Sequence, residues 1–206
     1  RAGALHGHAL VMLGETTGEV EQLASAVSAL ADVLDQLGRD HSPLDWARAQ
    51  TSLAQGLQAM GEATSSERAY EQAATCYDRA AVALRHAPAL SLRAVVASNR
   101  AICLVRSAEL TGDLAVLDAA EAAFRMELTD QPGRRDPAAW ALLQVNLARL
   151  YEARMEITGR DNGERAAAAT ALSTALDVFN EEGLRSLALM TIEALERLRG
   201  PTSARI

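Results

Sequence analysis

Two segments of the chain, PLDWARAQTSLA at residues 43–54 and PAAWALLQVNLA at residues 137–148, share the pattern P-x-x-W-A-x-x-Q-x-x-L-A. They begin 94 residues apart, which is twice 47. Three further columns recur every 47 residues in the same register: Ala47, Ala94, Ala141 and Ala188; Ala26, Ala73, Ala120 and Ala167; and Leu10, Leu57, Leu104, Tyr151 and Leu198. Alanine-rich chains produce chance matches, but a register that also aligns tryptophan and glutamine indicates an internal repeat.

Each unit of 47 residues is predicted to form two helices. In the clearest copy the first, helix A, runs from about Asp45 to Gly61, because its apolar and small residues fall at helical spacing on one side. A Glu-x-Thr-Gly segment follows in three of the four copies, and glycine there favours a left-handed stop; the second copy has Ser65 instead. Helix B then starts at a capping residue, for which Ser66, Asp113, and Asp161 or Asn162 are the candidates.

The alanine columns predict that neighbouring helices approach closely, while the larger Leu30, Tyr77 and Phe124 fill the space between pairs. No single helix pair buries both of its faces, so stacking of pairs is required and the fold class is all-α, an α-solenoid of antiparallel helix pairs. The chain is read as one domain, 1–206, with repeats at about 1–42, 43–89, 90–136 and 137–183 and a capping helix at about 184–199.

Two positions depart from the repeat pattern. Arg100 stands where Leu53 and Leu147 stand, so we expect a buried stem with an exposed head, or an ion pair with a nearby carboxylate. In the last helix B, Ala171 replaces the aromatic residue of the earlier copies, and a slip of the register is expected there.

Composition narrows the function classes. All 20 basic residues are arginine, and without lysine there is no Schiff-base chemistry and no Walker-A phosphate loop. The formal net charge of −7 argues against broad nucleic-acid affinity, and no apolar run is long enough for a membrane span. Two cysteines without a CxxC motif are expected to be buried and reduced, which favours a cytoplasmic location. Because the chain begins at Arg1, it is expected to be a domain of a longer protein.

The repeat resembles the tetratricopeptide repeat family, in a long form common in bacterial multidomain proteins. That family carries W-x-x-L-G-x-x-Y in helix A and A-x-x-x-F-x-x-A in helix B, followed by proline. The matching residues are Gln50, Leu53, Ala54 and Leu57 in helix A and Ala73, Tyr77, Ala80 and Pro88 in and after helix B, with glutamine in the tryptophan place. The period of 47 instead of the usual 34 implies helices that are longer by a turn or two. The resemblance implies a right-handed solenoid of about four repeats plus the capping helix.

The resemblance further implies that the A helices line a concave groove that binds a peptide or protein. The groove candidates are Arg48, Ser52, Gln55, Asn99, Ile102, Arg106, Asn146 and Arg149, with Val95 and Glu152 on the same face. Asn99 and Asn146 match a place where family members often hold a peptide backbone. The three arginines suggest an acidic or C-terminal carboxylate ligand, since arginine binds carboxylates in bidentate fashion. The alternative is a solvated polar face without a ligand.

One glutamate per repeat recurs near the end of helix A, as Glu15, Glu62, Glu109 and Glu156. The helix dipole disfavours an anion at this end by roughly 0.3–1 kcal/mol, so a local partner is expected. One interpretation is a bond to the start of helix B or an ion pair with an arginine of a neighbouring helix. The other is an acidic stripe that recognises a basic partner.

No catalytic or metal-binding spacing is found in the sequence: there is no H-E-x-x-H, no Cys/His cluster and no G-x-S-x-G elbow. We therefore expect no catalytic residue, no metal and no cofactor. The leading hypothesis is a non-enzymatic scaffold that binds a protein or peptide in the groove, with no nucleic-acid or membrane partner. The alternative is a structural module that self-associates, as a homo-oligomer, or regulates a catalytic or signalling domain fused to it.

Overall fold

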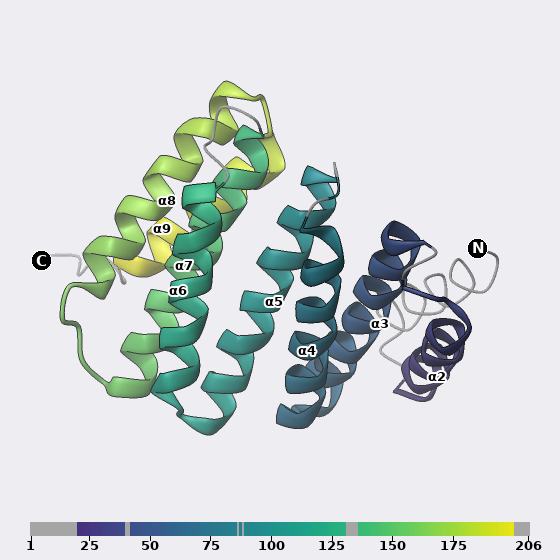
Figure 1. Cartoon of the computed structure of the whole chain (residues 1–206). Helices are drawn as coiled ribbons and strands as arrows, with labels where there is room; N and C mark the ends of the chain where they lie inside the picture. The colour runs from purple at the N-terminus through teal and green to yellow at the C-terminus, as the bar shows by residue number, and fades with distance from the viewer. Residues whose placement is uncertain (1–19, 40–41, 86, 88, 131–135, 200–206) are drawn as a thin grey trace, which may run out of the picture. The chain divides into compact units, whose positions relative to one another are not determined.

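The computed structural model describes residues 20–39, 42–85, 87, 89–130 and 136–199 (Figure 1). These residues form helices and their connections and contain no strand, which confirms the all-α prediction for the described part of the chain. The helices are α2 (Val20–Gln36), α3 (Pro43–Thr64), α4 (Glu67–Leu84), α5 (Leu90–Thr111), α6 (Leu114–Asp130), α7 (Pro137–Thr158), α8 (Glu164–Glu181) and α9 (Arg185–Arg199). Among them none is long and apolar enough to cross a membrane.

The period of 47 residues is visible in the helix boundaries. The A helices α3, α5 and α7 each have 22 residues, and they begin at residues 43, 90 and 137 and end at 64, 111 and 158. The B helices α2, α4 and α6 begin at residues 20, 67 and 114, again 47 apart. Helix α9 begins one residue after the predicted position 184. The predicted first helix A, with Leu10 and Glu15, lies outside the described residues.

The chain divides into two compact units, residues 1–116 and 117–206, which are described separately. In the first unit α2 packs on α3, α3 on α4 and α4 on α5, and α3 also touches α5. In the second unit α7 packs on α8 and α8 on α9. A turn of two residues joins α3 to α4, so these two helices form a helical hairpin.

The alanine columns are buried as expected wherever the register holds. Ala47, Ala94, Ala141 and Ala188 are all buried on the A helices and α9, and Ala26, Ala73 and Ala120 are fully buried on the B helices. The larger Leu30, Tyr77 and Phe124 are also fully buried. Side chains of minimal size at these positions let helix backbones come close, while the larger residues fill the remaining volume.

The prediction for the fourth member of the B-helix column, Ala167, is wrong. Helix α8 begins at Glu164, three residues later than the period requires, because five residues separate it from α7 where two separate α3 from α4. This insertion turns the helix face, so that Ala167 is half-buried while its neighbour Ala168 is fully buried. The slip expected near Ala171 is therefore a loop insertion. The cap predicted for this helix, Asp161 or Asn162, is also wrong, because the longer connection makes Gly163 the N-cap, with no side-chain cap hydrogen bond.

The recurring threonine and glycine at the end of helix A form a helix stop. Thr64, Thr111 and Thr158 each donate a hydroxyl hydrogen bond to the carbonyl four residues earlier, at 2.6, 3.0 and 2.7 Å respectively. The next residues, Ser65, Gly112 and Gly159, have φ values of 50°, 71° and 64°, and their N–H groups bond back to the last turn. The left-handed stop that the sequence predicts is thus confirmed in all three described copies.

Polar networks add to the apolar packing in both units. Arg100 of α5 donates from Nε to Asp78 Oδ1 of α4 at 2.5 Å, which confirms the expected ion pair at this departure from the repeat. In the second unit Arg154 of α7 contacts Asp118 and Glu121 of α6 at 2.7 and 2.9 Å. The Tyr151 hydroxyl also donates to Glu121, at 3.2 Å.

Candidate functional site

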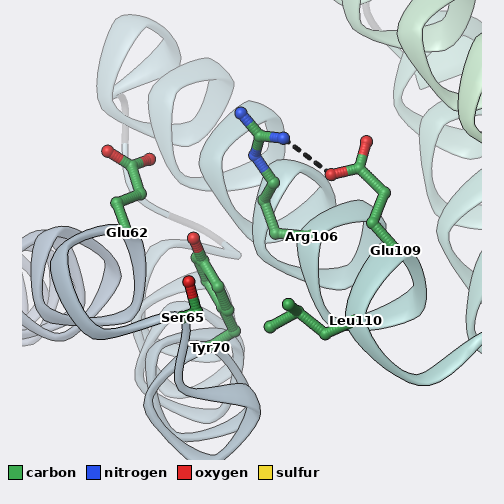
Figure 2. Close-up of a pocket in the computed structure, with 6 residues that line it drawn as sticks. All are labelled: Glu62, Ser65, Tyr70, Arg106, Glu109 and Leu110. Carbon is green, nitrogen blue, oxygen red and sulfur yellow. Dashed lines mark hydrogen bonds and ion pairs between the residues drawn. The ribbon is translucent and has the colours of Figure 1, made fainter.

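A polar pocket of about 330 Å³ lies in the first unit, where the last turns of α3 and α5 meet the first turn of α4 (Figure 2). The residues that line it are Glu62, Ser65, Tyr70, Arg106, Glu109 and Leu110. The two A helices end 47 residues apart in the chain, so repeat-equivalent residues, Glu62 and Glu109, reach the same pocket. Figure 2 shows the Tyr70 ring extending between these helix ends, with its hydroxyl on the side of Glu62 and Arg106.

Gly61 lets the Tyr70 ring take this position. A Cβ atom at residue 61 would lie 3.0 Å from two carbons of the ring, which is closer than an unstrained contact permits. Ser66 is the N-cap of α4, and its hydroxyl oxygen accepts a hydrogen bond from the Ala69 N–H at 3.3 Å. The glycine and the cap together place Tyr70 as one wall of the pocket.

Tyr70 is a buried residue with a free polar end. It is 4% exposed, and its hydroxyl makes no hydrogen bond to any described residue. Burial raises the pKa of this phenol, and the negative charge of Glu62 raises it further, while Arg106 acts in the opposite direction. The group therefore stays a neutral donor and acceptor at the edge of the pocket.

The charges in the pocket are unevenly paired. Arg106 Nη1 lies 2.6 Å from Glu109 Oε2 on the same helix, so this guanidinium is already engaged by a carboxylate. Glu62 accepts a hydrogen bond from Gln58 Nε2 at 3.3 Å and makes no ion pair with a described residue. Two carboxylates and one guanidinium leave the lining with a formal net charge of −1.

Two of the glutamates at the ends of the A helices, Glu62 and Glu109, have partners on their own helices. Gln58 donates a hydrogen bond to Glu62, and Arg106 forms an ion pair with Glu109. The predicted bond to helix B, or ion pair with an arginine of a neighbouring helix, is therefore wrong for these two residues. The reason is geometric, since side chains three or four positions apart on a helix lie next to each other. Glu15 lies outside the described residues.

The predicted groove residues of α3 and α5 occupy one stripe on each helix, and both stripes lead to this pocket. Residues 48, 55 and 62 follow a spacing of seven on α3, and residues 95, 102 and 109 do so on α5, so each glutamate continues the groove face. Of the predicted residues, Arg106 lines the pocket. The others are distributed over three helices: Arg48, Ser52 and Gln55 on α3, Asn99 and Ile102 on α5, and Asn146 and Arg149 on α7.

These residues are not all available to a ligand. Arg48 is exposed but lies 3.5 Å from Asp45 on its own helix, and Ser52, Gln55, Asn99 and Ile102 are half-buried. Asn146 and Arg149 are half-buried in the second unit and already have interactions there. Because Arg48 and Arg106 are each neutralised by a carboxylate, the geometry does not favour the carboxylate ligand that three arginines suggested.

The sequence reasoning missed Ser65, Tyr70 and Leu110 as pocket residues. One signal was present: Tyr70 occupies the column that holds Leu23 and Leu117 in the neighbouring copies. A tyrosine in a column of leucines adds a hydroxyl to a buried ring, and that hydroxyl must point to a polar surface. The ring's direction depends on Gly61, which the pattern of apolar residues does not reveal.

A second pocket, of about 320 Å³, lies at the equivalent place in the second unit. Glu152, Met155 and Glu156 line it from α7, Arg165 from α8, and Arg197 and Leu198 from α9. Arg197 Nη2 lies 3.5 Å from Glu152 Oε2. Burial raises the pKa of the Glu152 carboxyl, and the nearby Arg197 lowers it. Two carboxylates and two guanidiniums give this lining no net charge, in contrast to the first pocket.

The described residues contain no group of three or more histidine, cysteine, aspartate or glutamate side chains that would hold a metal ion. Both cysteines are buried thiols, and burial, with Glu62 as a second cause, raises the pKa of Cys103 to about 12. Such a thiol stays protonated at neutral pH and is a poor nucleophile.

Comparison of the chain with family models, with curated proteins and with solved structures found no match.

Proposed function

We propose that the chain is a non-enzymatic interaction scaffold, a tetratricopeptide-like α-solenoid that binds a protein or peptide along the face of its A helices. The equal lengths and the spacing of 47 residues between α3, α5 and α7 support a repeat architecture of about four units plus a capping helix. Buried, unpaired thiols are in keeping with a reducing, cytoplasmic setting.

The observation that carries the proposal is the pocket at the ends of α3 and α5. It lies at the end of the stripe of groove residues, and it offers carboxylates, a guanidinium, a phenol and the partly exposed Leu110 side by side. Such a mixture of a few polar groups with apolar surface is typical of recognition sites.

Selection of peptides from a random display library on the immobilised full chain tests this function. We expect enrichment of a shared motif whose binding is weakened at least about tenfold by the double substitution Asn99→Ala with Asn146→Ala, since buried polar contacts to a peptide backbone are lost. Asn180→Ala is the matched control, because it removes the same side chain from an exposed position on α8. Failure to enrich any motif, or equal binding by the double variant, would count against the groove.

A second candidate function, self-association, has one specific observation in its favour. Helix α9 exposes Leu189 and Met190, at 61% and 64%, next to the less exposed Ile192. Exposed large apolar side chains that lie together often mark an interface. Light scattering over a wide range of protein concentrations separates the two functions: a mass that rises with concentration, and that Leu189→Ser with Met190→Ser abolishes, supports self-association. A constant monomer mass rejects it.

A further inference from the structure

We propose that the pocket lined by Glu62, Tyr70, Arg106 and Glu109 is a subsite for a cationic side chain, an arginine or lysine, of the partner peptide. This inference rests on the proposed scaffold function and names the chemistry that the scaffold would recognise. It also selects between the two ligand charges that the sequence leaves open, because it favours a basic partner over an acidic one.

The unpaired carboxylate of Glu62 is the first argument. Arg106 forms its ion pair with Glu109 at 2.6 Å, and the charge of Glu62 acts on it from farther away. The described hydrogen-bond partner of Glu62 is the uncharged amide of Gln58. The pocket therefore carries one negative charge in excess. A guanidinium or ammonium group entering it would form the charge-assisted hydrogen bonds that the pocket lacks.

Tyr70 is the second, independent argument. Its side chain is almost completely buried, and its hydroxyl points into the pocket without a hydrogen-bond partner among the described residues. The ring is buried while the hydroxyl oxygen opens onto the pocket, where it can donate a hydrogen bond to an entering group or accept one from it. A phenolic oxygen can accept a hydrogen bond from a guanidinium N–H, while the exposed Leu110 offers apolar surface to the methylene groups of the same side chain.

The equivalent pocket of the second unit supplies a comparison inside the same chain. The lining of that pocket holds Glu152 and Glu156 together with Arg165 and Arg197, so its formal charge is zero. Arg197 lies 3.5 Å from Glu152, and Arg165 lies 3.4 Å from Asp161. Its α8 wall holds Arg165, and no tyrosine is among its lining residues. A cation should therefore enter the first pocket and not the second.

The test is a titration of the isotopically labelled full chain with N-acetyl-arginine N-methylamide, followed by amide chemical shifts in NMR. We expect saturable shifts confined to the amides around Glu62, Ser65, Tyr70 and Leu110. The uncharged analogue with citrulline in place of arginine has nearly the same shape, and it should produce no saturable shift there. Equal shifts with both probes, or shifts that are as large around Glu156, would overturn the proposal.

Two matched variants assign the binding to the named groups. Glu62→Gln should weaken the apparent affinity about tenfold, because it removes the charge and keeps the shape. Glu156→Gln, at the repeat-equivalent position in the balanced pocket, should leave it unchanged. Tyr70→Phe removes the hydroxyl alone and should weaken binding by a smaller factor, with an unchanged melting temperature. If Glu62→Gln binds the arginine probe as tightly as the parent, while its melting temperature is also unchanged, the subsite is wrong.

Failure of this subsite and failure of the scaffold function give different results. Selected peptides that keep their affinity when each arginine is replaced by citrulline and each lysine by norleucine would overturn the subsite and leave the scaffold intact. A chain that binds the arginine probe in the first pocket but enriches no peptide would retain the subsite and lose the scaffold.

Discussion

At the scale of single residues, Gly61 and Tyr70 belong together. The ring of Tyr70 fills the space that a side chain at position 61 would need, and the next copy of the repeat has Ala108 and Leu117 at the corresponding positions. A larger residue in one column thus accompanies a smaller one in the other. This pairing shows how one copy acquired a polar wall while its neighbour kept apolar residues.

Gly61→Ala should destabilise the protein by up to about 2 kcal/mol, because strain against the buried ring costs roughly 1–3 kcal/mol and the better helix propensity of alanine returns about 1 kcal/mol. Urea unfolding followed by circular dichroism measures the change. Adding Tyr70→Leu to Gly61→Ala should recover part of the loss, since the leucine leaves room for the methyl group. A double variant that is less stable than the sum of its two single changes would contradict this account.

Cys103 makes stability depend on alkaline pH. Its pKa is raised from 9.0 to about 12 in the folded chain, so between these values the unfolded chain loses the proton while the folded chain keeps it. Stability is therefore fully present below pH 9.0 and falls as the pH rises towards 12. We expect the urea midpoint to fall between pH 8 and pH 11, and to fall less steeply in Cys103→Ala.

The Cys103→Ala variant keeps Tyr70 and Cys76, whose pKa values are also raised by burial, so a smaller alkaline slope remains. At neutral pH the variant should lose about 1 kcal/mol from the smaller side chain. If the urea midpoint falls equally steeply with pH in the variant and in the parent, ionisation of the Cys103 thiol is not the cause of the alkaline loss of stability.

At the scale of the helix, the stop after helix A is built from two side chains in each copy. The threonine hydroxyl satisfies a carbonyl of the last turn, and the following residue takes a left-handed backbone conformation. Gly112 and Gly159 adopt it without strain, whereas Ser65 adopts it with a Cβ atom. This difference locates a weak point in the second copy.

Ser65→Gly should stabilise the protein by roughly 0.5–1 kcal/mol, since it removes the strain of a left-handed serine and the serine side chain makes no described hydrogen bond. The reverse change, Gly112→Ser, should destabilise by a similar amount, because a Cβ there has open space but the wrong backbone angle. Thermal melting of the two variants beside the parent measures both. A loss of stability in Ser65→Gly would show that the serine contributes a contact that outweighs its strain.

At the scale of the whole molecule, charge favours a basic partner. The chain has 27 acidic and 20 basic residues, and the first pocket adds a local negative excess to this global one. Long-range attraction speeds the encounter of opposite charges and is screened by salt, with a screening length of about 10 Å at 0.1 M.

We therefore expect the association rate of a selected arginine-containing peptide to fall about tenfold between 0.05 and 0.5 M sodium chloride, with a smaller change in its dissociation rate. Stopped-flow fluorescence with a labelled peptide measures both rates. A peptide with the same apolar residues and glutamine in place of arginine is the control, and its association rate should hardly respond to salt. An equal response of the two peptides would contradict charge steering.

Most of the helical organisation follows from local sequence. Apolar spacing, the threonine and glycine columns and the period of 47 residues predict the A helices and their left-handed stops, because these signals depend on residues within one or two turns. Helix α3, Pro43–Thr64, begins two residues before and ends three residues after the predicted range Asp45–Gly61. The exception is α8, where a three-residue insertion shifts the start and exchanges Ala167 for Ala168 in the core. A comparison of residues 47 positions apart does not reveal such an insertion here, because residues 167 and 168 are both alanine.

The candidate site is different, because the sequence predicts Arg106 and the two glutamates as features of a repeat but not as neighbours around one pocket. Two features depend on where three helix ends meet: the pairing of Arg106 with Glu109, and the position of the Tyr70 hydroxyl at the pocket. Periodicity specifies the face of the helix on which a residue lies. The sequence alone therefore determines the helices and which residues share a face. Distances between side chains of different helices decide which charge is left unpaired, and only the folded packing sets them.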